Sequence, residues 1–409
     1  MQSNSVAVIG GGASGLFAGL SASMSGADVT IYESCDRVGR KILATGNGRC
    51  NLTNLYADEK DYHGENPSFI GGVKNQFWVD ETLAFFEDIG LVYKSEEEGK
   101  VYPYSDTATS VLDVLRAAVE KENITVVNNT EIKELIKKKD GFMVISFSGE
   151  RFFHNKVIVA AGGKAAPALG SKGSGYDILQ KFGHSKTELS PSLVQLCCEG
   201  DVPKKLKGIK VLATLSVENK SQKGEILFAD YGISGPPVFF LSAYIKKGTT
   251  AYIDLMDEYT EEEIISMLYT RICKNPSVTL DRFFVGILNK RVGEVFLKSI
   301  GIAPLSRTAD SLLEEEITKI ASSIKKWKFK ITGTMSWNNA QVTRGGIKTN
   351  EFCPETLESE KIKGLYACGE ILDIDGDCGG YNLQWAWASG YVAGKSAAQN
   401  KLPKENVQR

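Results

Sequence analysis

Residues 5–15 read Ser-Val-Ala-Val-Ile-Gly-Gly-Gly-Ala-Ser-Gly, and this stretch decides the fold. Its first five residues are suited to a short buried strand, and the glycine spacing follows at once. A helix of small residues is expected from there to about Ser25, followed by a second strand over residues 28–32. Strand, helix and strand form a βαβ unit, which predicts an α/β protein built on a parallel, doubly wound sheet.

Each glycine of the spacing Gly10-x-Gly12-x-x-Gly15 has its own use in a dinucleotide-binding turn. Gly10 permits the tight turn, Gly12 lets the backbone approach a pyrophosphate, and Gly15 lets the helix pack closely on the strand. The helix N-terminus offers free N–H groups to phosphate, and Ser14 adds a hydroxyl. Glu33 ends the second strand, where a carboxylate can bind both ribose hydroxyls. These features favour a dinucleotide site over a purely structural glycine turn.

Two later stretches favour FAD over NAD as the resident dinucleotide. The apolar strand that starts at Val157 ends in Ala-Gly-Gly at 161–163. Near the C-terminus, a strand over 365–368 leads into Gly369-Glu370, then Asp373 and Gly379-Gly380 before a helix. A second glycine turn at the far end of the chain suits an extended cofactor. None of the three histidines lies in an attachment motif, so the FAD is expected to be non-covalent.

A loop rich in glycine and asparagine, residues 40–51, follows the ribose-binding acid. Arg40 and Lys41 can face phosphate, and backbone amides near Gly46 can face a flavin edge. Arg40 and Lys41 can equally form an ordinary surface pair. Arg49 is either a donor near the flavin or one side of a structural salt bridge.

Composition excludes several classes of protein. The 409 residues carry 48 Lys and Arg against 50 Asp and Glu, so phosphate-driven nucleic-acid binding is not expected. No stretch reaches the roughly 18 apolar residues of a membrane helix, and no signal peptide or zinc pattern is evident. The eight cysteines are expected to be reduced, with Cys50 and Cys378 serving packing. We therefore expect a cytoplasmic protein without a metal, in an undetermined oligomeric state.

The character of the chain changes along its length. Strand patterns lie at 124–127, 142–147 and 151–160, and helical spacing lies at 80–89 and 107–121. We assign residues 1–188 and 334–409 to a discontinuous Rossmann-like FAD-binding domain. Residues 189–256 and 323–333 are expected to form a β-barrel-like insertion, and residues 257–322 a helical subdomain.

Taken together, these motifs resemble the HI0933-like flavoprotein family, also described as aminoacetone-oxidase-like. The matching stretches are Val8 to Gly15, Arg40 to Asn54, Val101 to Ser110, Val342 to Ile347, and Gly369 to Gly394. The sequence Gly-Gly-Tyr-Asn-Leu-Gln-Trp-Ala at 379–386 is the most specific. The resemblance covers essentially the whole chain and implies an FAD fold with an inserted barrel and a helical subdomain.

The resemblance also implies a set of cofactor contacts. They comprise Gly10, Gly12, Ala13, Ser14, Gly15, Glu33, Arg40, Lys41, Gly46, the backbone around Ile132 on the adenine side, Gly369, Glu370, Asp373, Gly380, Asn382 and Leu383. Many relatives carry Thr in place of Cys378 and an acid in place of Asn339. Both positions can lie near the flavin, so the substrate is not carried over, and no catalytic residue is identified.

Three functions are compatible with these residues. The first is reduction of a C=C bond conjugated with a ketone, driven by a transient NAD(P)H, as in the bile-acid and steroid 3-oxo-Δ4,6 reductases assigned within the family. The second is an amine or aminoketone oxidase that returns electrons to O2. The third is a flavin protein acting on a macromolecule, against which the near-zero net charge argues. The apolar run Ile233 to Phe240 motivates a further expectation, that the insertion covers the flavin and sets substrate choice.

Overall fold

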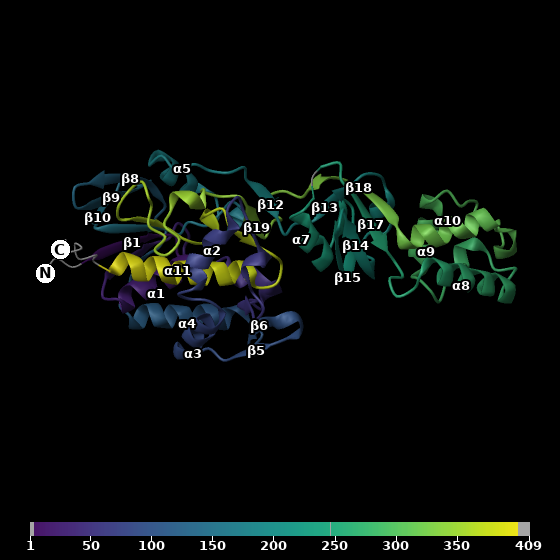
Figure 1. The fold of residues 1–409 in the computed structure, drawn as a ribbon, viewed down its shortest axis with the longest axis horizontal. Coiled ribbons are helices and arrows are strands. Elements are labelled where there is room, and N and C mark those ends of the chain that lie inside the picture. Colours follow the sequence, from purple (N-terminus) through teal and green to yellow (C-terminus); the bar gives the residue numbers. More distant parts are fainter. Residues whose placement is uncertain (1–3, 246, 400–409) are drawn as a thin grey trace, which may run out of the picture. The chain divides into compact units, whose positions relative to one another are not determined.

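The computed structural model describes residues 4–245 and 247–399, and the chain divides into two compact units (Figure 1). Unit 1 comprises the residues up to Pro191 and those from Ala340 onward, and unit 2 comprises Ser192–Asn339. Each unit buries its own apolar core. Unit 2 is therefore an insertion into the sequence of unit 1.

Unit 1 is built on a parallel sheet with the strand order β20-β11-β1-β2-β7. In that order the strands span Leu365–Ala367, Lys156–Val159, Ser5–Ile9, Asp28–Tyr32 and Thr125–Val127. The chain first adds β2 and β7 on one side of β1, and later adds β11 and β20 on the other. Open parallel sheets bind ligands outside the carboxyl ends of the strands at such a reversal. The Rossmann-type α/β fold predicted from residues 5–33 is confirmed.

Helices and small sheets surround this sheet. The helices are α1 (Ala13–Met24), α2 (Ile70–Lys74), α3 (Val79–Asp88), α4 (Ala108–Lys121), α5 (Ser174–Lys181) and α11 (Tyr381–Ala398). One antiparallel sheet joins β8 (Ile132–Lys138), β9 (Gly141–Ser146) and β10 (Arg151–His154). A second joins β3 (Thr53–Asn54), β6 (Lys100–Pro103) and β5 (Tyr93–Ser95). Two strand pairs complete the unit: β4 (Tyr62–His63) with β21 (Asp375–Gly376), and β12 (Ser190–Ser192) with β19 (Val342–Arg344).

Unit 2 combines a closed six-stranded barrel with helices, which confirms the barrel expected in the insertion. The barrel order is β13-β16-β15-β14-β17-β18. These strands span Leu196–Cys198, Gly232–Ser234, Lys220–Ala229, Lys210–Val217, Thr250–Asp254 and Trp327–Thr334. The helices are α6 (Val202–Lys205), α7 (Pro236–Ser242), α8 (Glu261–Lys274), α9 (Lys290–Ser299) and α10 (Glu314–Lys325). Among the described residues, no helix is long and apolar enough to cross a membrane.

Part of the apolar run that motivated a flavin cover belongs to the core of unit 2. Ile233 lies in β16 and is fully buried. Val238 lies in α7 and is fully buried in the same cluster, against which the half-buried Phe240 packs. Pro236 is exposed and Phe239 is half-buried, so the core accounts for only part of the run, and the role over a cofactor stays a prediction.

The closest helix packing in unit 1 is between α1 and α11, which lie side by side (Figure 1). A Cβ on Gly390 would lie 2.3 Å from the Ser14 carbonyl oxygen, and one on Gly394 would lie 2.1 Å from that of Ala18. A step of four residues from Gly390 to Gly394 thus corresponds to a step of four residues from Ser14 to Ala18 in the same chain direction. The two helices therefore run parallel. Only glycine allows backbone to touch backbone at these two positions.

We predict that Gly394→Ala destabilises the protein. The added methyl group would meet a backbone oxygen that cannot rotate away, and overpacking of this kind costs about 1–3 kcal/mol. The free energy of unfolding, measured in urea, should fall by that amount. Gly71→Ala in α2 is the matched control, because there the nearest atom is the flexible Glu59 carboxylate at 3.3 Å. Equal stability of the two variants would contradict the packing argument.

Candidate functional site

The turn between β1 and α1 has the geometry that a phosphate requires. Gly10 has φ +103°, and a Cβ there would lie 2.5 Å from the Ala160 carbonyl oxygen. A Cβ on Gly15 would lie 1.8 Å from the Gly10 oxygen. A Cβ on Gly12 would meet nothing within 4 Å. Gly10 and Gly15 are therefore required by packing, whereas Gly12 borders open space.

The start of α1 leaves N–H groups available beside that space. Gly12 is the N-cap and makes no side-chain cap hydrogen bond. The Leu16 N–H reaches back to the Gly12 carbonyl at 2.9 Å, so the N–H groups of Ala13, Ser14 and Gly15 have no intrahelical acceptor. Their partial positive charge favours an anion at this end of the helix.

Glu33 holds the glycine turn in place. Its Oε2 accepts a hydrogen bond from the Gly11 N–H at 2.8 Å, and its Oε1 accepts one from the Cys35 N–H at 2.8 Å. The side chain is 8% exposed. Oε1 also accepts a hydrogen bond from the Ser34 hydroxyl at 3.2 Å, so the capacity left for a ligand hydroxyl is the second lone pair of Oε2. Sequence reasoning assigned Glu33 to a ribose alone, and the structure adds this backbone role.

Ile132 lies in the same region as Glu33. The Glu33 carbonyl accepts a hydrogen bond from the Thr130 N–H at 2.8 Å, two residues before Ile132 at the start of β8. Ile132 is 3% exposed. The segment implied for the adenine side therefore follows directly on the segment implied for the ribose.

The second glycine turn abuts the first. Gly369 opens the short turn Gly369–Ile371 after β20, and a Cβ there would lie 2.4 Å from Ser14 Oγ. Its N–H donates to Ser389 Oγ at 2.9 Å, and its carbonyl accepts from Trp385 Nε1 at 3.1 Å. Residues more than 350 positions apart in the sequence thus meet at the N-terminus of α1.

Lys41 and Glu370 form an ion pair. Lys41 Nζ lies 2.8 Å from Glu370 Oε2, and Glu370 Oε1 accepts a hydrogen bond from the Thr343 N–H at 2.7 Å. The pair joins the loop after β2 to the turn after β20. Arg40 lies nearer the surface, with one nitrogen 3.7 Å from Asp36 and another 3.3 Å from the Ala168 carbonyl.

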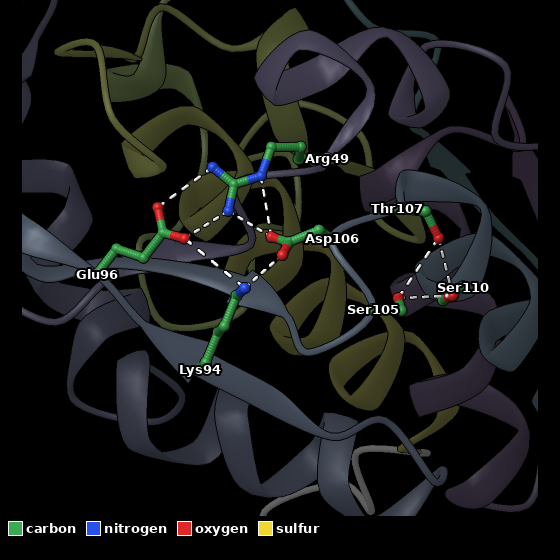
Figure 2. A network of polar contacts seen from close by, with 7 residues as sticks. All are labelled: Arg49, Lys94, Glu96, Ser105, Asp106, Thr107 and Ser110. Atoms are coloured by element: carbon green, nitrogen blue, oxygen red, sulfur yellow. Dashed lines mark hydrogen bonds and ion pairs between the residues drawn. The ribbon is translucent and has the colours of Figure 1, made fainter.

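Arg49 belongs to a salt-bridge network (Figure 2). Its guanidinium donates to Asp106 and to Glu96, and lies 4.0 Å above the Tyr102 ring centroid. Lys94 also contacts Asp106. All three guanidinium nitrogens are engaged, so the structure supports the salt-bridge alternative for Arg49 rather than a donor near a flavin. The network ties the residue 40–51 loop to β5 and to the turn before α4.

Gly46 lies within the same loop, in the turn Ile42–Gly48, with φ +56°. A Cβ there would lie 2.8 Å from the Asn51 backbone nitrogen. The loop is therefore folded back closely on itself at this glycine.

The N-terminus of α11 forms a second group of free donors. Gly380 is its N-cap, with φ +102° and no side-chain cap, and a Cβ there would lie 2.5 Å from the Thr53 carbonyl oxygen. The N–H groups of Tyr381, Asn382 and Leu383 have no intrahelical acceptor. The Asn382 side chain accepts from the Gly376 N–H at 2.9 Å and donates to the Gly376 carbonyl at 2.7 Å, which fixes the preceding loop.

The parallel packing of α1 and α11 sets the spacing between the two helix starts. Ser14 is the second residue of α1, whereas Gly390 beside it is the tenth of α11. At about 1.5 Å per residue, α11 starts about 12 Å ahead of α1 along their shared direction. Two anion-favouring helix ends with this stagger suit a long dinucleotide whose phosphates and ring lie apart.

Buried polar atoms also fit a bound cofactor. Asn51 Oδ1 and the Tyr176 hydroxyl are buried, and neither has a hydrogen-bond partner among the described residues. Asn51 Oδ1 lies beside Gly380, 2.9 Å from where a Cβ would stand. Unsatisfied buried polar atoms are rare in proteins and call for a ligand or water. The residues present therefore fit FAD.

Asp373 lies between Gly369 and Gly380 in the sequence. It is 3% exposed, and its Oδ2 accepts a hydrogen bond from the Glu65 N–H at 2.9 Å. Burial is the main cause that raises the pKa of the Asp373 carboxyl above its ordinary value. Asn51 lies in the loop over residues 40–51 that the sequence marks as a cofactor segment, whereas the sequence carries no signal for Tyr176, because a lone phenol matches no motif.

The cysteines are free thiols, and the two that lie in the cofactor motifs, Cys50 and Cys378, are poorly suited to redox chemistry. Burial raises the pKa of the Cys50 thiol to about 12 and also raises the pKa of the Cys378 thiol. Reactive cysteines have lowered pKa values instead. Within the described residues, no group of His, Cys, Asp and Glu could hold a metal ion.

One cluster looks like a hydrolase triad but is structural. His184 contacts Glu351 Oε2 through Nδ1 at 2.9 Å and Ser359 Oγ through Nε2 at 2.9 Å. Ser359 Oγ also accepts hydrogen bonds from the N–H groups of Lys361 and Ile362, at 3.1 and 2.9 Å. Both serine lone pairs are thus occupied, so the oxygen is not available as a nucleophile.

Comparison with known proteins places this site in a family. The model of the HI0933-like protein Rossmann domain matches residues 4–396. A 3-dehydro-bile acid delta(4,6)-reductase of Clostridium scindens is 39% identical, over 97% of this chain and 99% of the relative. A ribosomal RNA dihydrouridine synthase of Escherichia coli is 30% identical, over 94% of this chain and 96% of the relative.

A solved structure with a similar course of the chain is a 3-ketosteroid-delta4-(5alpha)-dehydrogenase from Rhodococcus jostii. It is 15% identical, covers 97% of this chain and 96% of its own, and has a TM-score of 0.49. The match of the family model over nearly the whole chain, together with the full-length reductase relative, shows that this chain belongs to the HI0933-like family of Rossmann-type flavin oxidoreductases.

Proposed function

We propose that this protein is an FAD-dependent reductase that adds hydrogen across a C=C bond conjugated with a ketone in a small molecule. NAD(P)H is the proposed electron donor. The observation that carries the proposal is the full-length relationship, at 39% identity, to a bile-acid delta(4,6)-reductase. The substrate is accordingly of the steroid 3-oxo-Δ4,6 type.

The chain's own residues supply binding and orientation. The N–H groups at the start of α1 would hold the pyrophosphate, Glu33 the ribose, and the N-terminus of α11 the flavin. Lys41 and Glu370 compensate each other's charge, so they would position the turn rather than neutralise phosphate. When bound, FAD would accept a hydride from the donor and pass it to the activated carbon.

The RNA-directed relative supports the same class of bond. Dihydrouridine differs from uridine by hydrogen added across a C=C bond that is conjugated with a carbonyl. Both relatives' names therefore describe reduction of an activated double bond, in a steroid or in a base. Action on ribosomal RNA is the second candidate, favoured by the relative at 30% identity. The balanced charge of the chain and the higher identity of the reductase favour the small molecule.

Anaerobic absorbance spectroscopy separates the candidates. The purified protein should be yellow and should release its flavin in acid. NADH or NADPH should bleach the flavin, and a 3-oxo-Δ4 steroid should restore the colour. Recovery with ribosomal RNA but not with the steroid would favour the second candidate. Bleaching by an aminoketone, with none by nicotinamide, would instead indicate an oxidase.

We predict that Glu33→Ala weakens FAD binding by one to two decades. The variant removes a charged acceptor worth about 1.5–3 kcal/mol. It also leaves the buried N–H groups of Gly11 and Cys35 without their acceptor, so the melting temperature should fall as well. Isothermal titration of the apoprotein with FAD measures the first effect, and thermal unfolding measures the second.

Asp28→Ala is the matched control. It removes the same charge from the exposed opposite end of β2. Its FAD affinity should equal that of the wild type. Undiminished FAD affinity in the Glu33 variant would show that the carboxylate is not part of the cofactor site.

A further inference from the structure

Asp375 is a buried carboxylate to which no role is assigned above. It lies in β21 and pairs with His63 of β4. Directly opposite residues in an antiparallel pair project to the same face, so the two side chains are neighbours. Asp375 is 1% exposed, and neither of its carboxylate oxygens has a hydrogen-bond partner among the described residues.

Such a group is costly to keep ionised, because charge is poorly solvated inside a protein. Nearby groups act on it in both directions. Arg344 and His63 favour its ionised form, whereas Asp373 and Asp377 disfavour it. Burial outweighs these charges and raises the pKa of the Asp375 carboxyl to about 6.

Asp373 shows what a structural carboxylate at this place looks like. Its Oδ2 accepts a hydrogen bond from the Glu65 N–H at 2.9 Å, which gives it a fixed partner. Asp375 lies only two residues further on and has none. Packing alone would be served better by an apolar side chain of similar size, so the carboxylate calls for a role in which its charge changes.

Titratable groups that reach the surface lie beside Asp375. Asp377, two residues further on, contacts His63 with 2.8 Å between Oδ1 and Nε2. The His63 and Asp377 side chains are 18% and 16% exposed, so both reach solvent. His63 lies opposite Asp375 in the strand pair, which puts an imidazole in contact with solvent next to the buried carboxylate.

The segment that carries Asp375 is bonded to the start of α11. Gly376, the residue after Asp375, donates its N–H to Asn382 Oδ1 and accepts a hydrogen bond from Asn382 Nδ2, in the first turn of α11. That turn is where the proposed function puts the flavin. A change of charge on the flavin would be felt at Asp375, because the protein between them screens charge weakly.

We propose that Asp375 is a proton acceptor coupled to the flavin: it takes up a proton from solvent, by way of Asp377 and His63, when FAD bound at the start of α11 is reduced. This inference rests on the proposed function. A hydride from the donor would bring two electrons and one proton to the bound flavin, a net charge of −1, which would raise the proton affinity of Asp375. One O–H bond forms on the carboxylate and one proton leaves the solvent, and this offsets the added charge. Asp375 would act on the flavin through its charge and need not touch the substrate.

The first experiment needs no variant. Flavin-loaded wild-type protein is reduced electrochemically at about pH 7.5, above the pKa of Asp375, while infrared difference spectra are recorded. A carboxylic-acid C=O band should appear on reduction and shift in D2O. Yellow protein that shows no such band on reduction overturns the inference and leaves the proposed function standing. Protein that binds no FAD overturns both.

The second experiment uses Asp375→Asn to test whether Asp375 is the group that takes up the proton when the flavin is reduced. The midpoint potential of the flavin is measured between about pH 6.5 and 8.5. Each proton taken up with two electrons changes the potential by about 30 mV per pH unit, so the wild type should have a slope steeper than that of the variant by this amount. The infrared band should be lost as well. Identical slopes, or a retained band, overturn the inference.

Asp88→Asn is the matched control, because it removes an exposed carboxylate at the end of α3. Its slope and its infrared band should equal those of the wild type. Should Asp375→Asn fail to fold, His63→Gln tests the route: the band should still form, but more slowly after a rapid reduction. Formation at the wild-type rate would overturn the route through His63.

Discussion

Direct backbone contact between α1 and α11 is the constraint on which the rest of unit 1 depends. Gly390 and Gly394 let α11 lie against the carbonyl groups of Ser14 and Ala18. Once these contacts form, the two parallel helices can no longer slide along each other. The distance between their first residues is therefore fixed by packing and not by the loops that precede them. The Trp385 indole, which donates to the Gly369 carbonyl, then ties the second glycine turn to the same pair.

Local pattern was sufficient for the elements whose burial is simple. The strand over 5–9, the helix after it and the strand over 28–32 follow from an apolar run and a glycine turn. The hydrophobic pattern gave a wrong result where one continuous apolar segment contributes strands to two different sheets. Residues 151–160, expected as one strand, divide at Asn155 into antiparallel β10 and parallel β11. The Asn155 side chain accepts from the Ser5 N–H at 3.0 Å, a tertiary contact that periodicity does not contain.

In the candidate site, the sequence likewise does not reveal which charged residues form ion pairs. The sequence marks Lys41 and Arg49 as cations near a dinucleotide turn, but not where their counter-charges lie. Glu370 is 329 residues from Lys41, and Glu96 is 47 residues from Arg49. Both cations are paired within the protein, and this reduces the positive charge left for phosphate. The glycine turns needed no such partner, since their function depends on backbone shape, and so they were recognisable from spacing alone.

This pairing makes the helix N-termini a source of positive potential that no side chain among the described residues offsets by an ion pair, and they bear on why a neutralisable carboxylate lies beside α11. A helix start stabilises negative charge within about its first turn. An ionised Asp375 and a reduced flavin at the start of α11 would compete for the same stabilisation. Taking up a proton removes the carboxylate from that competition. The free N–H groups of α11 then act on the flavin alone, at the moment when its charge is greatest.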